Sequence, residues 1–153
     1  MVTAGGVYKD VFTVLAALLS AASTALAQNI QLSSPTANAT LTPGQNTTVQ
    51  VEFPNSLTGA QHVSLVIGLA SCSSGSGCPT DAFSGLGKPL YVGGFDPQYH
   101  ESALPPYQNF SVQIPEDASG VNLLTVAHFM LLGASTTPVL DFSNATVTVG
   151  SSN

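Results

Sequence analysis

Charge is the property that this sequence has least of. Its 153 residues contain 2 Lys and Arg and 8 Asp and Glu, so charged residues make up 7% of the chain, against about 25% in ordinary soluble domains. After residue 27, Lys88 is the only Lys or Arg. A protein that binds nucleic acid or an acidic membrane surface needs several cations to neutralise phosphate groups. We therefore expect neither nucleic acid nor a membrane as a partner.

Catalytic signatures are also missing. The chain has no Trp and 7% aromatic residues, which does not suit a sugar-binding cleft, although a carboxylate pair for glycoside hydrolysis stays open from sequence alone. It contains neither the G-x-S-x-G motif of serine hydrolases nor the H-E-x-x-H motif of metalloproteases. We therefore predict a protein that is not an enzyme and needs no cofactor.

The longest apolar run lies near the N-terminus, from Val11 to Ala27, and ends in the small-x-small sequence Ala25-Leu26-Ala27. Such a run before such a sequence is typical of a cleaved secretory signal peptide. A membrane anchor is the alternative, but it needs about 20 apolar residues, and this run is shorter and contains Ser and Thr. We predict a signal peptide at residues 1–27, a single secreted domain at residues 28–153, and no membrane insertion after cleavage.

Short segments of alternating apolar and polar residues recur after residue 28, divided by clusters of Gly, Pro, Asn and Ser. In one of them, Val49, Val51 and Phe53 share one face, as in a strand with one buried side. No segment has a sustained helical period. The predicted strands are Asn29–Ser33, Thr47–Phe53, His62–Leu69, Pro89–Gly93, Asn109–Ile114, Asn122–Leu132 and Val139–Val149.

About seven short strands in one domain predict an all-β fold, namely an immunoglobulin-like β-sandwich. The Cys…Trp…Cys hallmark of true immunoglobulin domains is absent, because the chain has no Trp. The strand order therefore does not follow from the sequence.

The 2 cysteines, Cys72 and Cys78, flank a loop of Ser and Gly. An even cysteine count in a secreted chain predicts a disulfide. A redox or metal pair is the alternative, but the spacing is not C-x-x-C and no His lies near in sequence. Because a blue-copper centre needs a cysteine ligand, a disulfide here also argues against that kind of site.

Sequons for N-glycosylation occur at four asparagines. Asn46, Asn109 and Asn144 fall on the polar phase of their predicted strands, where a glycan would extend into water, and Asn38 falls in a predicted loop. We predict that at least two of these sites carry glycans, which would also compensate for the shortage of surface charge.

The three histidines differ in their surroundings. His62 begins a predicted strand and is expected to be exposed, whereas His128 lies in an apolar strand and is expected to hydrogen-bond within the sheet. His100 lies between Asp96 and Glu101 in a loop rich in functional groups. These three form a weak candidate for a metal or acid–base site, and a solvated loop is the simpler interpretation.

Several strings in the second half of the chain carry a family resemblance: Tyr91-Val92-Gly93, NFSVQIP at 109–115, AHFMLLGAS at 127–135 and NATVTVG at 144–150. The stretch from Leu90 to Gly150 resembles the fungal family named for necrosis-inducing secreted protein one. The first part, from Gln28, fits the layout of that family only loosely.

The resemblance implies a secreted, non-enzymatic effector that acts on plants. Members of that family are described as binding immune receptor kinases and suppressing pattern-triggered defence, so a plant immune receptor kinase is the implied partner. No residue is assigned to that contact. The alternative is a glycoprotein of the fungal cell wall or surface, which the abundance of Ser and Thr also fits. Both interpretations place the protein outside the fungal cell, either delivered to a host or associated with the wall.

Overall fold

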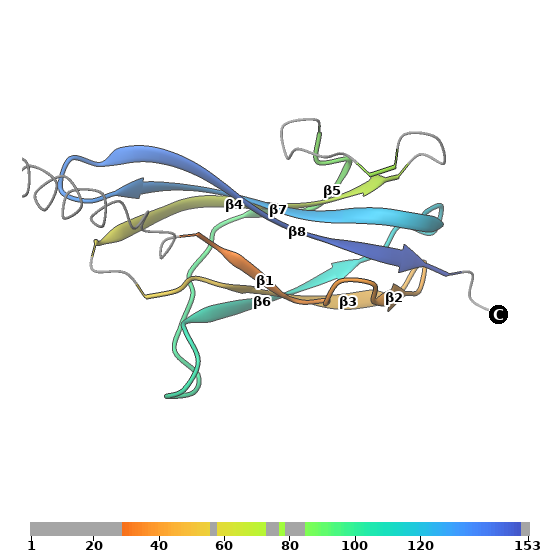
Figure 1. Ribbon diagram of the computed structural model, residues 1–153, viewed down its shortest axis with the longest axis horizontal. Helices are drawn as coiled ribbons and strands as arrows, with labels where there is room; N and C mark the ends of the chain where they lie inside the picture. The colour runs from red at the N-terminus through yellow and green to blue at the C-terminus, as the bar shows by residue number, and fades with distance from the viewer. Residues whose placement is uncertain (1–28, 56–57, 73–76, 79–84, 151–153) are drawn as a thin grey trace, which may run out of the picture.

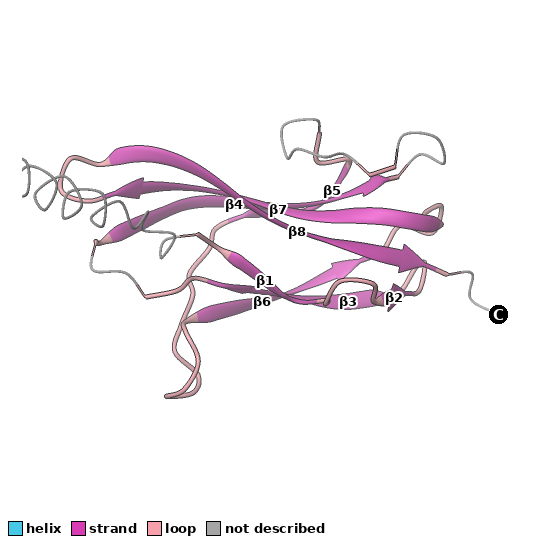
Figure 2. Ribbon diagram, viewed as in Figure 1, coloured by secondary structure: helices cyan, strands magenta, loops and turns pink. Residues whose placement is uncertain are grey.

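The computed structural model of the chain describes residues 29–55, 58–72, 77–78 and 85–150, so the predicted signal peptide lies outside the described residues. The described residues form strands and loops, without a helix (Figure 2). Accordingly, this part of the chain has no helix that is long and apolar enough to cross a membrane. The strands are β1 (Gln31–Ser34), β2 (Thr40–Leu41), β3 (Asn46–Glu52), β4 (Ala60–Ser71), β5 (Lys88–Gly93), β6 (Tyr107–Gln113), β7 (Gly120–Leu132) and β8 (Thr137–Val149).

These strands form two sheets that pack face to face (Figure 1). The smaller sheet has the order β1-β3-β6, and the larger has the order β2-β8-β7-β4-β5. Every pairing between the strands is antiparallel except the short contact of β2 with β8, which is parallel. The structure therefore confirms an all-β fold of the β-sandwich type.

Each predicted strand overlaps an observed one, and β2 is the strand that the sequence did not predict. It contains only Thr40 and Leu41, which is too short for an alternating pattern to be recognised. Its place is fixed by the parallel pairing of Thr40 with Thr148 and of Leu41 with Val149. A contact between residues so far apart in sequence leaves no local signal.

The core follows from the alternation within the strands. Val49 and Val51 are fully buried and Phe53 is nearly so, as the period of two predicts. The same holds for Phe110, Val112 and Ile114 and for Ala145, Val147 and Val149. Because each strand has one apolar face, the two sheets bury these faces against each other.

β7 and β8 are the longest strands, and they pair along their full length, from Gly120 with Val149 to Leu132 with Thr137. The loop between them contains Gly133, whose φ of 68° is readily adopted by glycine. This hairpin forms the centre of the larger sheet and carries His128 on its inner side.

Candidate functional site

Two histidines meet between the sheets, at one end of the sandwich. His62 is on β4 and His128 is on the neighbouring β7, 66 residues away, and His62 Nδ1 lies 3.0 Å from His128 Nε2. His128 is completely buried, whereas His62 is half-buried. The hydrogen bond expected for His128 is present, but its partner is the histidine that was predicted to be exposed. The prediction for His62 is therefore wrong.

A β-bulge in β4 explains the position of His62. The register runs from His62 opposite Met130 to Ser64 opposite Phe129, so Val63 is the extra residue. Without it, the alternation from the buried Leu65 would turn Val63 inward and His62 outward. With it, Val63 is 45% exposed and His62 faces the core.

Aromatic rings surround the histidine pair. The ring of Phe53 lies edge-on to His62 at 4.7 Å between centroids, and the ring of Phe95 lies 5.1 Å from both imidazoles. Burial, and then the neighbouring His62, lower the pKa of His128 to about 4. Burial also lowers the pKa of His62, although the Asp96 carboxylate partly opposes this. Both rings are therefore neutral at pH 7, and one N–H is shared between them.

One nitrogen of the pair has no partner. Among the described residues, His128 Nδ1 is buried and makes no hydrogen bond. A buried polar group without a partner costs about 1–3 kcal/mol, and most native buried groups avoid this cost. Such a group is a recognised feature of functional sites.

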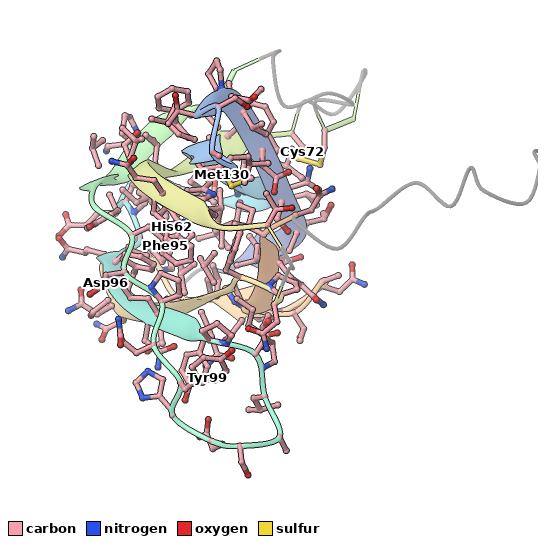
Figure 3. The ribbon with its side chains drawn as sticks, turned by 90° about the vertical axis from the view of Figure 1, so that its left-hand side faces the viewer. His62, Cys72, Phe95, Asp96, Tyr99 and Met130 are labelled. Carbon is pink, nitrogen blue, oxygen red and sulfur yellow. A yellow bond between two sulfur atoms is a disulfide. The ribbon has the colours of Figure 1, made fainter. Side chains whose placement is uncertain are left out.

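A loop of residues 94–106 leaves the sandwich beside this pair and projects beyond the smaller sheet (Figures 1 and 3). Its base is closed by backbone hydrogen bonds between Gln98 and Tyr107, at 3.1 and 3.0 Å. The Asp96 amide donates to the Gln108 side chain at 2.7 Å, and the Tyr99 hydroxyl donates to Asn55. The loop is therefore braced, although its outer residues contact water.

The predicted trio of Asp96, His100 and Glu101 lies in this loop but does not converge. Asp96 accepts a hydrogen bond from Gln98 at 2.8 Å, and Glu101 accepts one from Tyr107 at 3.3 Å. The His100 ring packs on the Tyr107 ring at 4.3 Å. In the described part of the chain, no three His, Cys, Asp or Glu side chains gather as metal ligands. The three residues brace the loop instead of sharing a site.

Cys72 and Cys78 are joined in a disulfide, with their Cα atoms 4.2 Å apart. The bridge follows the end of β4, and the Cys72 amide donates to the Val121 carbonyl at 2.9 Å. The bond therefore closes the loop after β4 next to the start of β7. Both cysteines are used in this structural role.

The asparagines of all four sequons are exposed. Asn46 and Asn109 lie on the outer face of the smaller sheet, at the polar positions of β3 and β6, and Asn144 lies on the outer face of the larger sheet. Asn38 lies in the loop between β1 and β2 with a φ of 66°. A glycan at any of these positions would extend into water, and their occupancy stays a prediction.

The outer face of the larger sheet carries no charge on its three longest strands. Outward positions alternate with the buried ones, and across β4, β7 and β8 they are Gln, Ser, Val, Gly, Ala, Leu, Thr, Phe, Pro and Asn. One row contains Val66, Ala127 and Phe142, side by side in register. The single acid of these strands, Asp141, points inward and accepts from the Ile30 amide at 2.6 Å. Part of this face is covered, since Leu123, Thr125 and Ala127 at outward positions of β7 are buried.

A family model, described as the Nis1 family, matches residues 25–148. The chain belongs to the Nis1 family. The match confirms the resemblance seen in the second half of the sequence. It also extends the resemblance over the first half of the domain, which the quoted strings had fitted only loosely. No curated protein matches this Nis1 family member.

Among solved structures, the fold of this Nis1 family member is similar to an AA10 lytic polysaccharide monooxygenase (LPMO) from Streptomyces lividans. The sequence identity is 14% and the TM-score is 0.48. The alignment covers 72% of this chain and 58% of that chain, so this chain spans little more than half of the enzyme's length. A likeness of this extent carries no conclusion about activity.

The sequence pointed to the loop but missed the histidine pair beneath it. Asp96, His100 and Glu101 stand close together in the chain and attract notice, although their side chains turn to separate partners. His62 and His128 are far apart in sequence, and a bulge decides that they face each other. The one available signal was a histidine within the apolar run of β7.

Proposed function

We propose that this Nis1 family member is a secreted, non-enzymatic effector that binds a plant immune receptor kinase and either suppresses pattern-triggered defence or induces necrosis. The observation that carries this proposal is the family match over residues 25–148, nearly the whole predicted domain. The apolar N-terminal run, the disulfide and the exposed sequons support a secreted protein.

The loop of residues 94–106 is the surface that suits such binding best. It projects from the sandwich, and Tyr99 and Leu104 are 63% and 45% exposed on it. Tyrosine is enriched at the centres of protein interfaces, because its ring is large and loses little conformational entropy on binding. The hydrogen bond from Tyr99 to Asn55 also holds the ring before a partner arrives.

Binding to the kinase domain of a plant immune receptor, measured with purified residues 28–153, tests the proposal. The flagellin-triggered oxidative burst and cell death in leaves expressing the protein provide the functional measurement. We expect Tyr99→Ala to weaken binding at least about tenfold, as at an interface hot spot. Tyr99→Phe keeps the ring and removes only the hydroxyl, so it should weaken binding less.

Val121→Ala is the matched control, since Val121 is 47% exposed on the larger sheet, away from the loop. Equal loss in Val121→Ala and Tyr99→Ala would remove the loop from the proposal while leaving kinase binding in place. A folded wild-type protein that binds no immune kinase and leaves the burst unchanged would refute the receptor proposal itself.

The uncharged outer face of the larger sheet favours a second candidate, a glycoprotein of the fungal cell wall. The exposed uncharged residues of this face, such as Val121 and Leu140, and the exposed sequon at Asn144 suit contact with neutral polymers or glycans. Fractionation of the fungus separates the two candidates. A wall protein stays with washed walls, whereas an effector appears in the culture filtrate.

A further inference from the structure

We propose that His62, His128 and Met130 form a buried site for a soft monovalent metal ion, Cu(I). The two imidazoles already face each other, and the thioether comes from the residue that pairs with His62 across the sheet. This site is separate from the loop residues that carry the proposed interface, and the inference does not depend on the effector function. Figure 3 shows His62 and Phe95 next to each other, and Met130 beside the strands of the larger sheet.

The three donors occupy adjacent positions on one face of the sheet. His62 and Met130 are register partners on β4 and β7, so their Cβ atoms lie about 4.5–5.5 Å apart. His128 and Met130 are two residues apart on β7 and point to the same side. Met130 is 1% exposed and His128 is 0% exposed. The three side chains therefore occupy neighbouring inward positions on β4 and β7, and the proposal is that they converge on one ion.

The separation of the two nitrogens is close to what a metal requires. Metal–imidazole bonds are about 2.0 Å long, so two nitrogens bound at a trigonal angle lie about 3.5 Å apart. The observed separation is 3.0 Å. The rings therefore need to part by about 0.5 Å, which a rotation of the half-buried His62 provides. The hydrogen bond also turns these two ring nitrogens toward each other, one as the donor and one as the acceptor.

The ring protons need little rearrangement. In one tautomer, His62 Nδ1–H donates to His128 Nε2. His128 Nε2 then already has a lone pair that can bind the metal. On metal binding, the proton of the half-buried His62 moves from Nδ1 to Nε2 of the same ring. This frees the lone pair of His62 Nδ1 for the metal. Both ligands stay neutral imidazoles, so binding releases no proton overall.

The surroundings select a soft ion of low charge. Thioether and imidazole ligands favour Cu(I), and the rings of Phe53 and Phe95 pack against the pair. Asp141 is the register partner of His128 on β8 and also points inward, but both of its carboxylate oxygens accept backbone amides, Oδ2 from Ile30 and Oδ1 from Phe142. Burying a divalent ion here would lack anionic ligands and cost far more than burying a single charge. Asp96, which acts electrostatically on His62, complements the single positive charge from outside.

Met130 makes the test direct. It is the only methionine after residue 27, so the secreted protein labelled with 13C-methyl methionine has one methyl resonance. We expect one equivalent of Ag(I), a redox-inert substitute for Cu(I), to shift this resonance. Competition with a chromophoric Cu(I) chelator under reducing conditions then gives the affinity. An unmoved methyl resonance at one equivalent would overturn the thioether ligand, and no competition with the chelator would overturn the site.

Variants assign the ligands. His62→Gln and His128→Gln should each weaken Cu(I) binding at least about 100-fold, and Met130→Leu about tenfold. His100→Ala is the matched control, because His100 is an exposed histidine packed on Tyr107 outside the site. If His128→Gln does not fold, the proposal is still tested by His62→Gln, since His62 is only half-buried, and by the methyl shift of the wild-type protein. Unchanged affinity in folded His62→Gln, or equal loss in His100→Ala, would refute the assignment.

Discussion

Acidification should destabilise the metal-free protein through His128. Its pKa is about 4 in the folded protein and 6.5 in the unfolded chain. Between these values the unfolded chain binds a proton that the folded protein does not, so lowering the pH favours unfolding. The full stability is present above pH 6.5 and is lost progressively as the pH falls toward 4.

The size of the loss follows from the same two pKa values. One pKa unit corresponds to about 1.4 kcal/mol, which gives a loss of about 2 kcal/mol at pH 5 and about 3 kcal/mol at pH 4. The lowered pKa of His62 acts in the same direction. Burial raises the pKa of Asp141, so protonation of that carboxyl as the pH falls favours the folded state and offsets part of the loss. The comparison of pH 7 with pH 5 is therefore the cleanest.

Urea unfolding in a chelating buffer measures the effect. Since the chain has no Trp, tyrosine fluorescence or far-UV circular dichroism reports unfolding. For a urea dependence of about 2 kcal/mol per molar, the midpoint should fall by about 1 M between pH 7 and pH 5. His128→Gln should show a much smaller fall, whereas His100→Ala should behave as the wild type. A wild-type midpoint that does not change, or an equal fall in His128→Gln, would refute the reasoning.

Three further changes test the framework around the site, each by urea unfolding at pH 7. Gly87→Ala should lower the free energy of unfolding by at least about 2 kcal/mol, because its φ is +69° and the new Cβ would meet the backbone of β4. Gly94→Ala should change it little, because a Cβ at that position would meet open space. Equal effects of the two substitutions would contradict the close approach of Gly87 to β4. Replacing Cys72 and Cys78 together by Ser should cost about 2 kcal/mol on the loop-entropy model, and an unchanged midpoint would show that the loop is held by other contacts. Asp141→Ala should lower the free energy of unfolding by about 1–3 kcal/mol, because it leaves the Ile30 amide without an acceptor. Asp141→Asn keeps a side-chain oxygen and should lower it less. A larger loss in Asp141→Asn than in Asp141→Ala would contradict the role of that oxygen.

The fold was predictable to the extent that local alternation encodes it. Val49, Val51 and Phe53 are buried as their spacing indicates, because side chains on a strand alternate between its two faces whatever the strand pairs with. The order of the strands depends on contacts between distant residues. β8, for example, lies between β7 and β2, and no pattern within residues 137–149 specifies those neighbours.

The histidine pair shows where such reasoning stops. Reading β4 as a regular strand places Val63 inside and His62 outside, since Leu65 is buried. The single extra residue at the bulge reverses that assignment for Val63 and His62, and it brings His62 Nδ1 to 3.0 Å from His128 Nε2. Val63 gains exposure that an apolar side chain does not favour, so the local sequence does not explain the bulge. The gain lies in burying His62 beside Phe53 and Phe95, on segments that local patterns cannot relate to β4. The bulge thus exposes a valine and pairs a half-buried histidine with a buried one, and the proposed metal site would give that pairing a function beyond packing.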